Sequence, residues 1–139
     1  MENVGLELLF KGNNFLRLWG GLWITLRIAL ISMLFSMILG FFLGIIMRIK
    51  NPVLKVICRI YLEIVRIMPQ LVLLFLVYFG AAKHLGVNMS GEGAAVLVFT
   101  FWGTAEMGDL VRSALGAIPK HQYESGYGLG LTKWQVYLY

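Results

Sequence analysis

The longest uncharged run in the chain, residues 28–47, sets the strongest limit on how the chain can fold. A helix of about 20 residues, rising 1.5 Å per residue, spans a hydrocarbon layer of roughly 30 Å. The whole sequence is 59% hydrophobic and only 14% charged, with a mean hydropathy of +0.78. So few polar residues cannot cover a soluble globule, and the sequence therefore predicts an all-α integral membrane protein.

The apolar segments predict three full membrane spans, at about residues 20–47, 54–82 and 93–118. A fourth segment begins at residues 132–139, but eight residues give only about 12 Å of helix. Residues 1–19 are interpreted as an external leader, which either lies on the membrane surface or is poorly ordered. The domain proper is expected to cover residues 20–139.

Basic residues predict the orientation of these spans. Arg48, Lys50, Lys55 and Arg59 crowd the connection between the first two spans, which marks it as cytoplasmic. The N-terminus is then expected outside, and the segment 119–131, which follows the third span, inside. The net charge of +5 is explained by this topology, so no nucleic-acid partner is expected.

Small residues recur every four positions along the first span. Ser32, Ser36, Gly40 and Gly44 form this stripe, and Gly40 with Gly44 makes a G-x-x-x-G pattern. Such a stripe lets a second helix approach closely. We interpret it as a helix-packing face, with a pathway-lining face as the alternative.

Charged and helix-breaking residues interrupt the second and third spans. Charges at this depth are costly unless they meet partners or water, so we consider them candidates for a gate or translocation path. The candidates are Glu63, Arg66, Pro69, Gln70, Glu106, Asp109 and Arg112. Glu63 could pair with Arg59 or Arg66, and Pro69 is expected to kink the second span. A purely structural set of interfacial ion pairs is the alternative.

The three charges of the third span lie three residues apart, so they share one broad face. Asp109 and Arg112 make a favourable pair. Glu106 and Asp109 repel each other unless one is protonated or a cation lies between them. We expect this face to look into the bundle interior or a water-filled passage.

Polar, glycine-rich sequence follows the third span. Pro119 is expected to end one helix and open a short new one, which Gly126, Gly128 and Gly130 keep brief. Thr132 and Gln135 have the spacing of a capping box, in which Thr132 caps the next helix and Gln135 reaches back.

Recognisable catalytic motifs are absent from the sequence. It has no phosphate-binding P-loop and no zinc or serine-hydrolase motif. Cys58 is the single cysteine, and His84 and His121 lie on opposite predicted sides of the membrane. We therefore expect no metal site, no cofactor and no enzymatic activity in this chain, and any ATP hydrolysis must come from another chain.

Three motifs, in order, give the chain a family resemblance. Glu124-Ser125-Gly126, three residues and Gly130 resemble the EAA loop of the permease subunits of bacterial ATP-binding-cassette importers, with Ser125 and Gly126 in place of the usual alanines. The run 61–71 is similar to the polar-amino-acid branch of that family, which takes up histidine, glutamate, glutamine, arginine or opines. The runs 109–114 and 118–122, taken together as one motif, are similar to the same branch. Ile67 and Met68 depart from its pattern.

This resemblance implies a fragment of a type I importer transmembrane domain, truncated within the EAA-loop region. Residues 119–131 would be a cytoplasmic coupling helix that docks on an ATPase subunit. The docking residues it implies are Pro119, Gln122, Tyr123, Glu124, Ser125, Gly126 and Gly130. ATP and Mg would bind the ATPase. The other implied partners are a second permease copy or homologue and an extracytoplasmic amino-acid-binding protein, at a bacterial cytoplasmic membrane.

Two other functions stay open from the sequence. Charged residues within the spans also suit a channel or secondary carrier that needs no ATPase. The small-residue stripe also suits an assembly subunit that does not itself transport.

Overall fold

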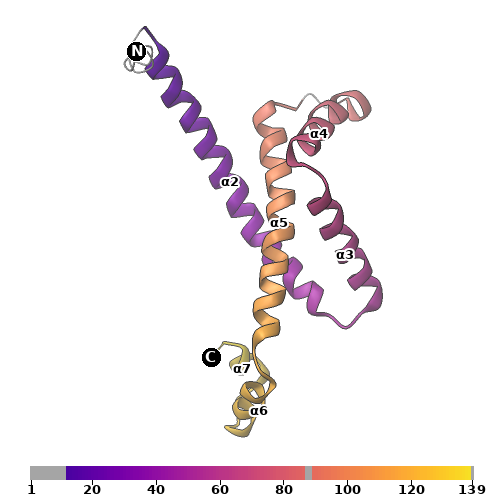
Figure 1. The fold of residues 1–139 in the computed structure, drawn as a ribbon. Helices are drawn as coiled ribbons and strands as arrows, with labels where there is room; N and C mark the ends of the chain where they lie inside the picture. The colour runs from indigo at the N-terminus through magenta and orange to yellow at the C-terminus, as the bar shows by residue number, and fades with distance from the viewer. Residues whose placement is uncertain (1–11, 87–88, 139) are drawn as a thin grey trace, which may run out of the picture.

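The computed structural model describes residues 12–86 and 89–138, and every regular element in this part of the chain is a helix (Figure 1). The all-α class predicted from composition is therefore confirmed. The helices are α2 (Asn14–Arg48), α3 (Pro52–Ile67), α4 (Gln70–Leu85), α5 (Gly91–Ala117), α6 (Lys120–Gly128) and α7 (Lys133–Leu138).

Two of these helices, α2 and α5, are long and apolar enough to cross a membrane without a break. They contain 35 and 27 residues, which correspond to roughly 52 and 40 Å of helix. Helix α2 begins at Asn14, so residues 14–19 continue the first span instead of forming a separate leader. Residues 1–11 of the predicted leader lie outside the described residues.

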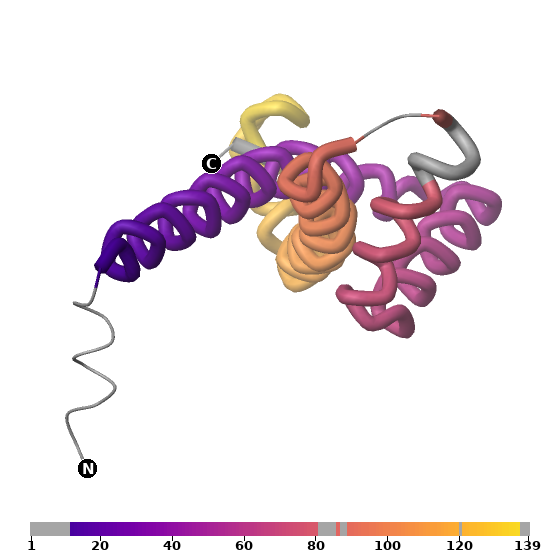
Figure 2. The backbone as a smooth tube through the Cα atoms, turned by 90° about the horizontal axis from the view of Figure 1, so that it is seen from above, coloured from indigo at the N-terminus to yellow at the C-terminus, as the bar shows by residue number. Residues whose placement is uncertain are grey.

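Helices α2 and α5 run in the same direction and cross each other (Figure 1). The contacts between them show the parallel direction. Ser32 of α2 contacts Val96 of α5, and Ser36 contacts Thr100, so a step of four residues along α2 corresponds to a step of four residues in the same direction along α5. Helix α5 contacts α2, α3 and α4, and the view along its axis shows it between the other helices (Figure 2). It is thus the central element, and its residues can meet polar groups from every neighbour.

The segment between α2 and α5 breaks at Pro69. Proline disfavours helical geometry in the residue before it, and Met68 is extended, with φ −78° and ψ 125°. Helix α3 therefore ends at Ile67, and α4 begins at Gln70 with its axis bent by 102° from that of α3. The sequence predicted a kink within one helix at Pro69. The structure instead has two separate helices on either side of it.

The parallel course of α2 and α5 requires the chain to return between them. The α3–α4 pair makes this return, from the end of α2 to the beginning of α5 (Figure 1). By length and composition the pair is either a broken span or a re-entrant loop. Three full spans therefore stay a prediction, whereas two helices among the described residues are each long and apolar enough to cross a membrane without a break.

Helix starts follow the local sequence closely. The Asn51 side chain accepts a hydrogen bond from Val53 N at 2.9 Å, and Pro52 occupies the first turn of α3. Ser90 caps α5 in the same way, accepting from Gly93 N at 3.1 Å. The expected capping box before α7 forms only in part: Gln135 accepts from Thr132 N at 2.9 Å, but the Thr132 hydroxyl donates to Gln135 Oε1 instead of capping an amide.

Candidate functional site

The small-residue stripe of α2 lies buried in its contact with α5. A Cβ added at Gly40 would lie 2.5 Å from Met107 Cβ, and one added at Gly44 would lie 2.6 Å from Val111 Cβ. Gly108 of α5 contributes from the other side, where an added Cβ would lie 2.8 Å from Leu43 Cδ2. The two backbones can approach this closely only because neither carries a side chain at these points.

The two serines of the stripe link the same pair of helices. Ser36 Oγ donates to the Thr100 carbonyl at 3.2 Å, and Ser32 Oγ lies 3.4 Å from the Val96 carbonyl. Both serines also line a cavity beside α2. The whole stripe therefore packs α2 on α5, and its two serines also border this cavity. The pathway-lining alternative stays a prediction.

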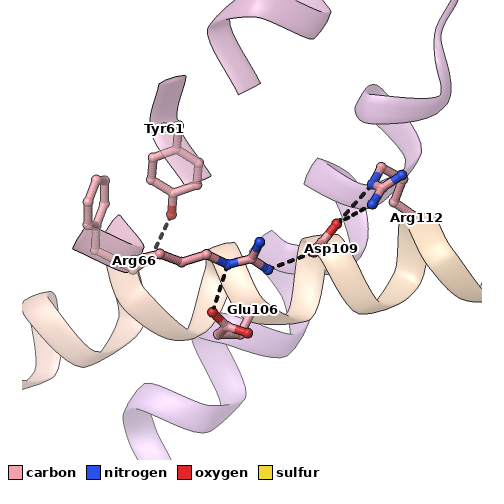
Figure 3. Close-up of polar contacts among 6 residues, drawn as sticks. Tyr61, Arg66, Glu106, Asp109 and Arg112 are labelled. Atoms are coloured by element: carbon pink, nitrogen blue, oxygen red, sulfur yellow. Dashed lines mark hydrogen bonds and ion pairs between the residues drawn. The ribbon is translucent and has the colours of Figure 1, made fainter. Parts of the chain in front are cut away.

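Arg66 of α3 joins the charges of the third span into one network (Figure 3). Its Nε donates to Glu106 Oε1 at 3.3 Å, and its Nη2 donates to Asp109 Oδ2 at 2.6 Å. Arg112 contacts the other oxygen of Asp109, from Nε at 2.9 Å and from Nη2 at 2.6 Å. A cation therefore lies between Glu106 and Asp109, one of the two conditions under which the sequence allowed these carboxylates to be neighbours.

Glu63, the other charged candidate on α3, pairs with Arg59. Arg59 Nε donates to Glu63 Oε1 at 2.9 Å, an i,i+4 pair whose side chains are 81% and 58% exposed. Of the two arginines that Glu63 could reach by spacing, only the one nearer the beginning of α3 binds it. Glu63 thus lies beside the network of Arg66 without joining it.

Tyr61 makes a second link between α3 and α5, which the sequence did not indicate. Its hydroxyl donates to the carbonyl of Phe101 at 2.5 Å, and the two rings pack edge to face with centroids 4.8 Å apart. With Arg66, it holds α3 to α5 at two points (Figure 3). No spacing rule finds such a contact, because its two residues are 40 positions apart.

Arg27 and Glu92 form an ion pair that the sequence analysis also missed. Arg27 lies in α2, and an arginine side chain is long enough to extend toward the head groups on its own. Instead it meets the first turn of α5, so the pair ties α2 to α5 at the end opposite the charge network. The sequence around a single arginine in a span does not show which residue it will pair with. That partner depends on how the helices pack.

Two cavities lie on either side of this charge network. The larger, about 830 Å³, lies between α2 and α5, and both Glu106 and Gln70 line it. The smaller, about 450 Å³, lies among the end of α2, α3 and α5, and Glu63, Arg66, Asp109 and Arg112 line it. Gln70 therefore faces a cavity, as the sequence allowed, and Pro69 marks the break that puts it there.

Helix α6 projects beyond the end of α5, with α7 folded beside it (Figure 1). Pro119 precedes its first residue, and the Pro119 carbonyl accepts from Gln122 N at 3.1 Å. Gly126 packs against α7, where an added Cβ would lie 2.9 Å from Val136 Cγ2. An alanine, usual at this point of the motif, would crowd Val136, so the departure at Gly126 has a local reason.

Gly130 ends this helical hairpin through its backbone conformation. Its φ is +78°, which is left-handed and favours glycine. Leu131 N donates to the Gly126 carbonyl and Gly130 N to the Tyr127 carbonyl, the two bonds of a Schellman motif. A Cβ at Gly130 would meet nothing within 4 Å, so the glycine is required here for its φ and not for close packing within the chain.

The remaining docking candidates lie mostly on the surface of α6. Gln122, Glu124 and Ser125 are exposed, and Tyr123 is partly covered. The structure thus presents a polar helical surface at the same end as Arg48, whose guanidinium approaches Gly116 near the end of α5.

Two parallel helices long and apolar enough to cross a membrane, a charge network between α3 and α5 and a short projecting helix place the chain in the class of helical membrane proteins. The chain belongs to the family of binding-protein-dependent transport system inner membrane components, whose family model matches residues 36–139.

Curated relatives agree with this family. The chain is 35% identical over 78 residues to the "Probable amino-acid ABC transporter permease protein YckA" of Bacillus subtilis strain 168, covering 56% of this chain and 34% of that protein. It is 30% identical over 119 residues to the "Probable glutamine ABC transporter permease protein GlnP" of the same organism, covering 86% and 54%. It is 31% identical over 87 residues to the "Arginine ABC transporter permease protein ArtQ" of Haemophilus influenzae strain Rd, covering 58% and 39%. The chain thus spans about a third to a half of these relatives.

A solved structure shares the fold. It is described as "Crystal structure of an amino acid ABC transporter with histidines" and matches with a TM-score of 0.70 at 24% identity. The match covers 81% of this chain and 52% of that one. The resemblance to importer permeases drawn from three short motifs is therefore confirmed at the level of family and fold.

Proposed function

We propose that this chain forms part of the membrane-spanning subunit of an ATP-driven, binding-protein-dependent importer of polar amino acids. The observation that carries the proposal is the family match over residues 36–139. The relatives named as glutamine and arginine permeases support the substrate class. ATP and Mg would bind a separate ATPase subunit, and a second permease chain and an extracytoplasmic binding protein would complete the importer.

In this proposal α6 is the coupling helix that docks on the ATPase. Its exposed Gln122, Glu124 and Ser125 supply polar contacts, and the Schellman turn at Gly130 holds it at a set angle to α7. A short helix joined to two membrane helices moves with them, so closure of the ATPase pair would tilt α5 and α7 together.

The charge network is the proposed gate or path lining. Arg66, Glu106 and Asp109 lie between the two cavities, and lipid would not tolerate such groups. The break at Pro69 places Gln70 at the larger cavity, and discontinuous helices of this kind line pathways in other transporters. Tilting α5 relative to α3 would strain the bonds of Arg66 and change the access to the larger cavity.

Docking is tested by co-purifying an importer ATPase subunit, co-expressed with this chain, through a tag on the chain. Glu124→Lys reverses an exposed charge on α6, and Gly130→Ala opposes the left-handed turn, which costs roughly 1 kcal/mol. We expect each to lower ATPase recovery, by about tenfold for Glu124→Lys. Gly128→Ala is the matched control, because a Cβ there meets nothing within 4 Å, and its recovery should equal that of the unaltered chain.

Equal ATPase recovery with Glu124→Lys, Gly130→Ala and Gly128→Ala would contradict the proposal that α6 is the docking element. Transport that persists without any nucleotide would instead favour a channel or secondary carrier.

A further inference from the structure

The cations around the smaller cavity outnumber the carboxylates, so ion pairs within the cavity cannot neutralise all of its positive charge. Its charged lining residues are Lys55, Arg59, Glu63, Arg66, Asp109 and Arg112. Glu106 adds a third carboxylate through its ion pair with Arg66. Four cations against three carboxylates leave the site with one net positive charge. The excess is concentrated on the first two turns of α3, at Lys55 and Arg59.

Lys55 and Arg59 both have N–H donors that no hydrogen bond within the described part of the chain uses. The backbone N of Lys55 donates to the Asn51 carbonyl, but its side chain makes no hydrogen bond or ion pair with any residue that the structure describes. All three N–H donors of its ammonium group are therefore free of such contacts. Arg59 gives only its Nε to Glu63, and its side chain is 81% exposed. Lys55 and Arg59 are four residues apart on α3 and therefore lie on one face, one turn from each other.

Apolar side chains line the same cavity beside these donors. Met47 and Cys58 are buried at 8% and 7% exposure, and Leu62 is partly covered. A small inorganic anion could use the donors but would gain nothing from this apolar wall. An amphiphile whose phosphate adjoins hydrocarbon would use both.

In the orientation predicted from charge, the cavity also lies at the depth of the phospholipid head groups. Met47 and Lys55 stand on either side of the basic connection that follows Arg48, the end of α2 that charge places at the cytoplasmic head groups. Basic pockets between membrane helices on this side are suited to lipid head groups.

We propose that this cavity binds the phosphate headgroup of an anionic phospholipid of the cytoplasmic leaflet, with Lys55 and Arg59 as its phosphate contacts. The proposal uses the predicted orientation but not the transport activity or the docking of α6. Arg66 and Arg112 already form ion pairs with carboxylates. They therefore mark the edge of the proposed site, and the phosphate is expected near the beginning of α3.

The test is native mass spectrometry of the detergent-purified chain titrated with phosphatidylglycerol, phosphatidylcholine or inorganic phosphate. We expect phosphatidylglycerol to bind roughly tenfold or more tightly than phosphatidylcholine, because each basic contact strengthens binding to anionic lipid several-fold. The double variant Lys55→Gln/Arg59→Gln should remove this preference. Arg17→Gln/Lys133→Gln removes the same number of exposed charges outside the cavity and should keep it.

Three results would overturn the proposal: equal binding of the two phospholipids, equal loss of preference in both double variants, or inorganic phosphate binding as tightly as phosphatidylglycerol. The last would assign the cavity to a free anion. Circular dichroism checks that the variants keep their helices. Should the cavity double variant lose its helical signal, Lys55→Gln alone must still lower the preference by about threefold or more.

Discussion

Arg66 is the residue on which the charge network depends. Its guanidinium reaches both carboxylates of α5, with Nε directed to Glu106 and Nη2 to Asp109. Lysine could not replace it, because a single ammonium lacks the planar fork that reaches two carboxylates at once. Three residues of the network are between about a fifth and a half exposed, so they meet open space and not only one another.

This exposure predicts which side chains of α5 face water. In a Cys58→Ala background, Glu106→Cys and Asp109→Cys should react with a membrane-impermeant thiol reagent in open membrane fragments. Leu34→Cys is the control, since Leu34 is 60% exposed on α2 but lines neither cavity, and it should stay unreactive in lipid. Unreactive cysteines at both 106 and 109 would contradict a water-filled path beside α5.

At this scale the sequence predicted pairs within one helix better than pairs between helices. The Asp109–Arg112 pair follows from their i,i+3 spacing, and the structure contains it. The Arg66–Asp109, Arg27–Glu92 and Tyr61–Phe101 contacts join distant segments. Such contacts depend on how helices pack, and no local spacing encodes that packing.

Among the elements, the contact between α2 and α5 gives a prediction about stability. Gly40→Ala would place a methyl group 2.5 Å from Met107 Cβ and 3.1 Å from Gly108 N. Overpacking of this kind costs about 1–3 kcal/mol, so thermal unfolding in detergent micelles should occur at a lower temperature. Gly21→Ala lies in the same helix, and its Cβ would meet nothing within 4 Å. It should not lower the unfolding temperature, because alanine is the better helix former.

A Gly40→Ala variant as stable as Gly21→Ala would show that the helices do not pack through this stripe. The stripe itself could be read from the sequence, because four small residues recur every four positions. Its partner could not be. Gly108 was not singled out, and α5 carries no repeat as regular as that of α2 to mark its packing face.

The break at Pro69 also separates what the local sequence predicts from what depends on packing. Proline predicts that a regular helix cannot continue through Met68, and the helix does end there. With the bend of 102°, α4 packs against α5. That packing involves residues far apart in the chain, so the sequence analysis expected only a kink.

Across the whole molecule, the basic residues and the projecting helix lie at one end. Arg48 lies near Gly116, and α6 follows directly after α5 at that end (Figure 1). Helices α2 and α5 run the same way, so Asn13, at the start of α2, lies at the far end of the molecule. The order of the three motifs was enough to predict the family, whereas orientation in the membrane stays a prediction from charge.

Docking on an ATPase requires α6 to face the cytoplasm, where the ATPase can reach it. Single cysteines at Asn13 and Ser125, both exposed positions, are introduced in a Cys58→Ala background and treated with a membrane-impermeant maleimide in right-side-out membrane vesicles. With α6 in the cytoplasm, we expect Asn13→Cys to be labelled in sealed vesicles and Ser125→Cys to be labelled only after they are opened. Labelling of Ser125→Cys in sealed vesicles would contradict this placement.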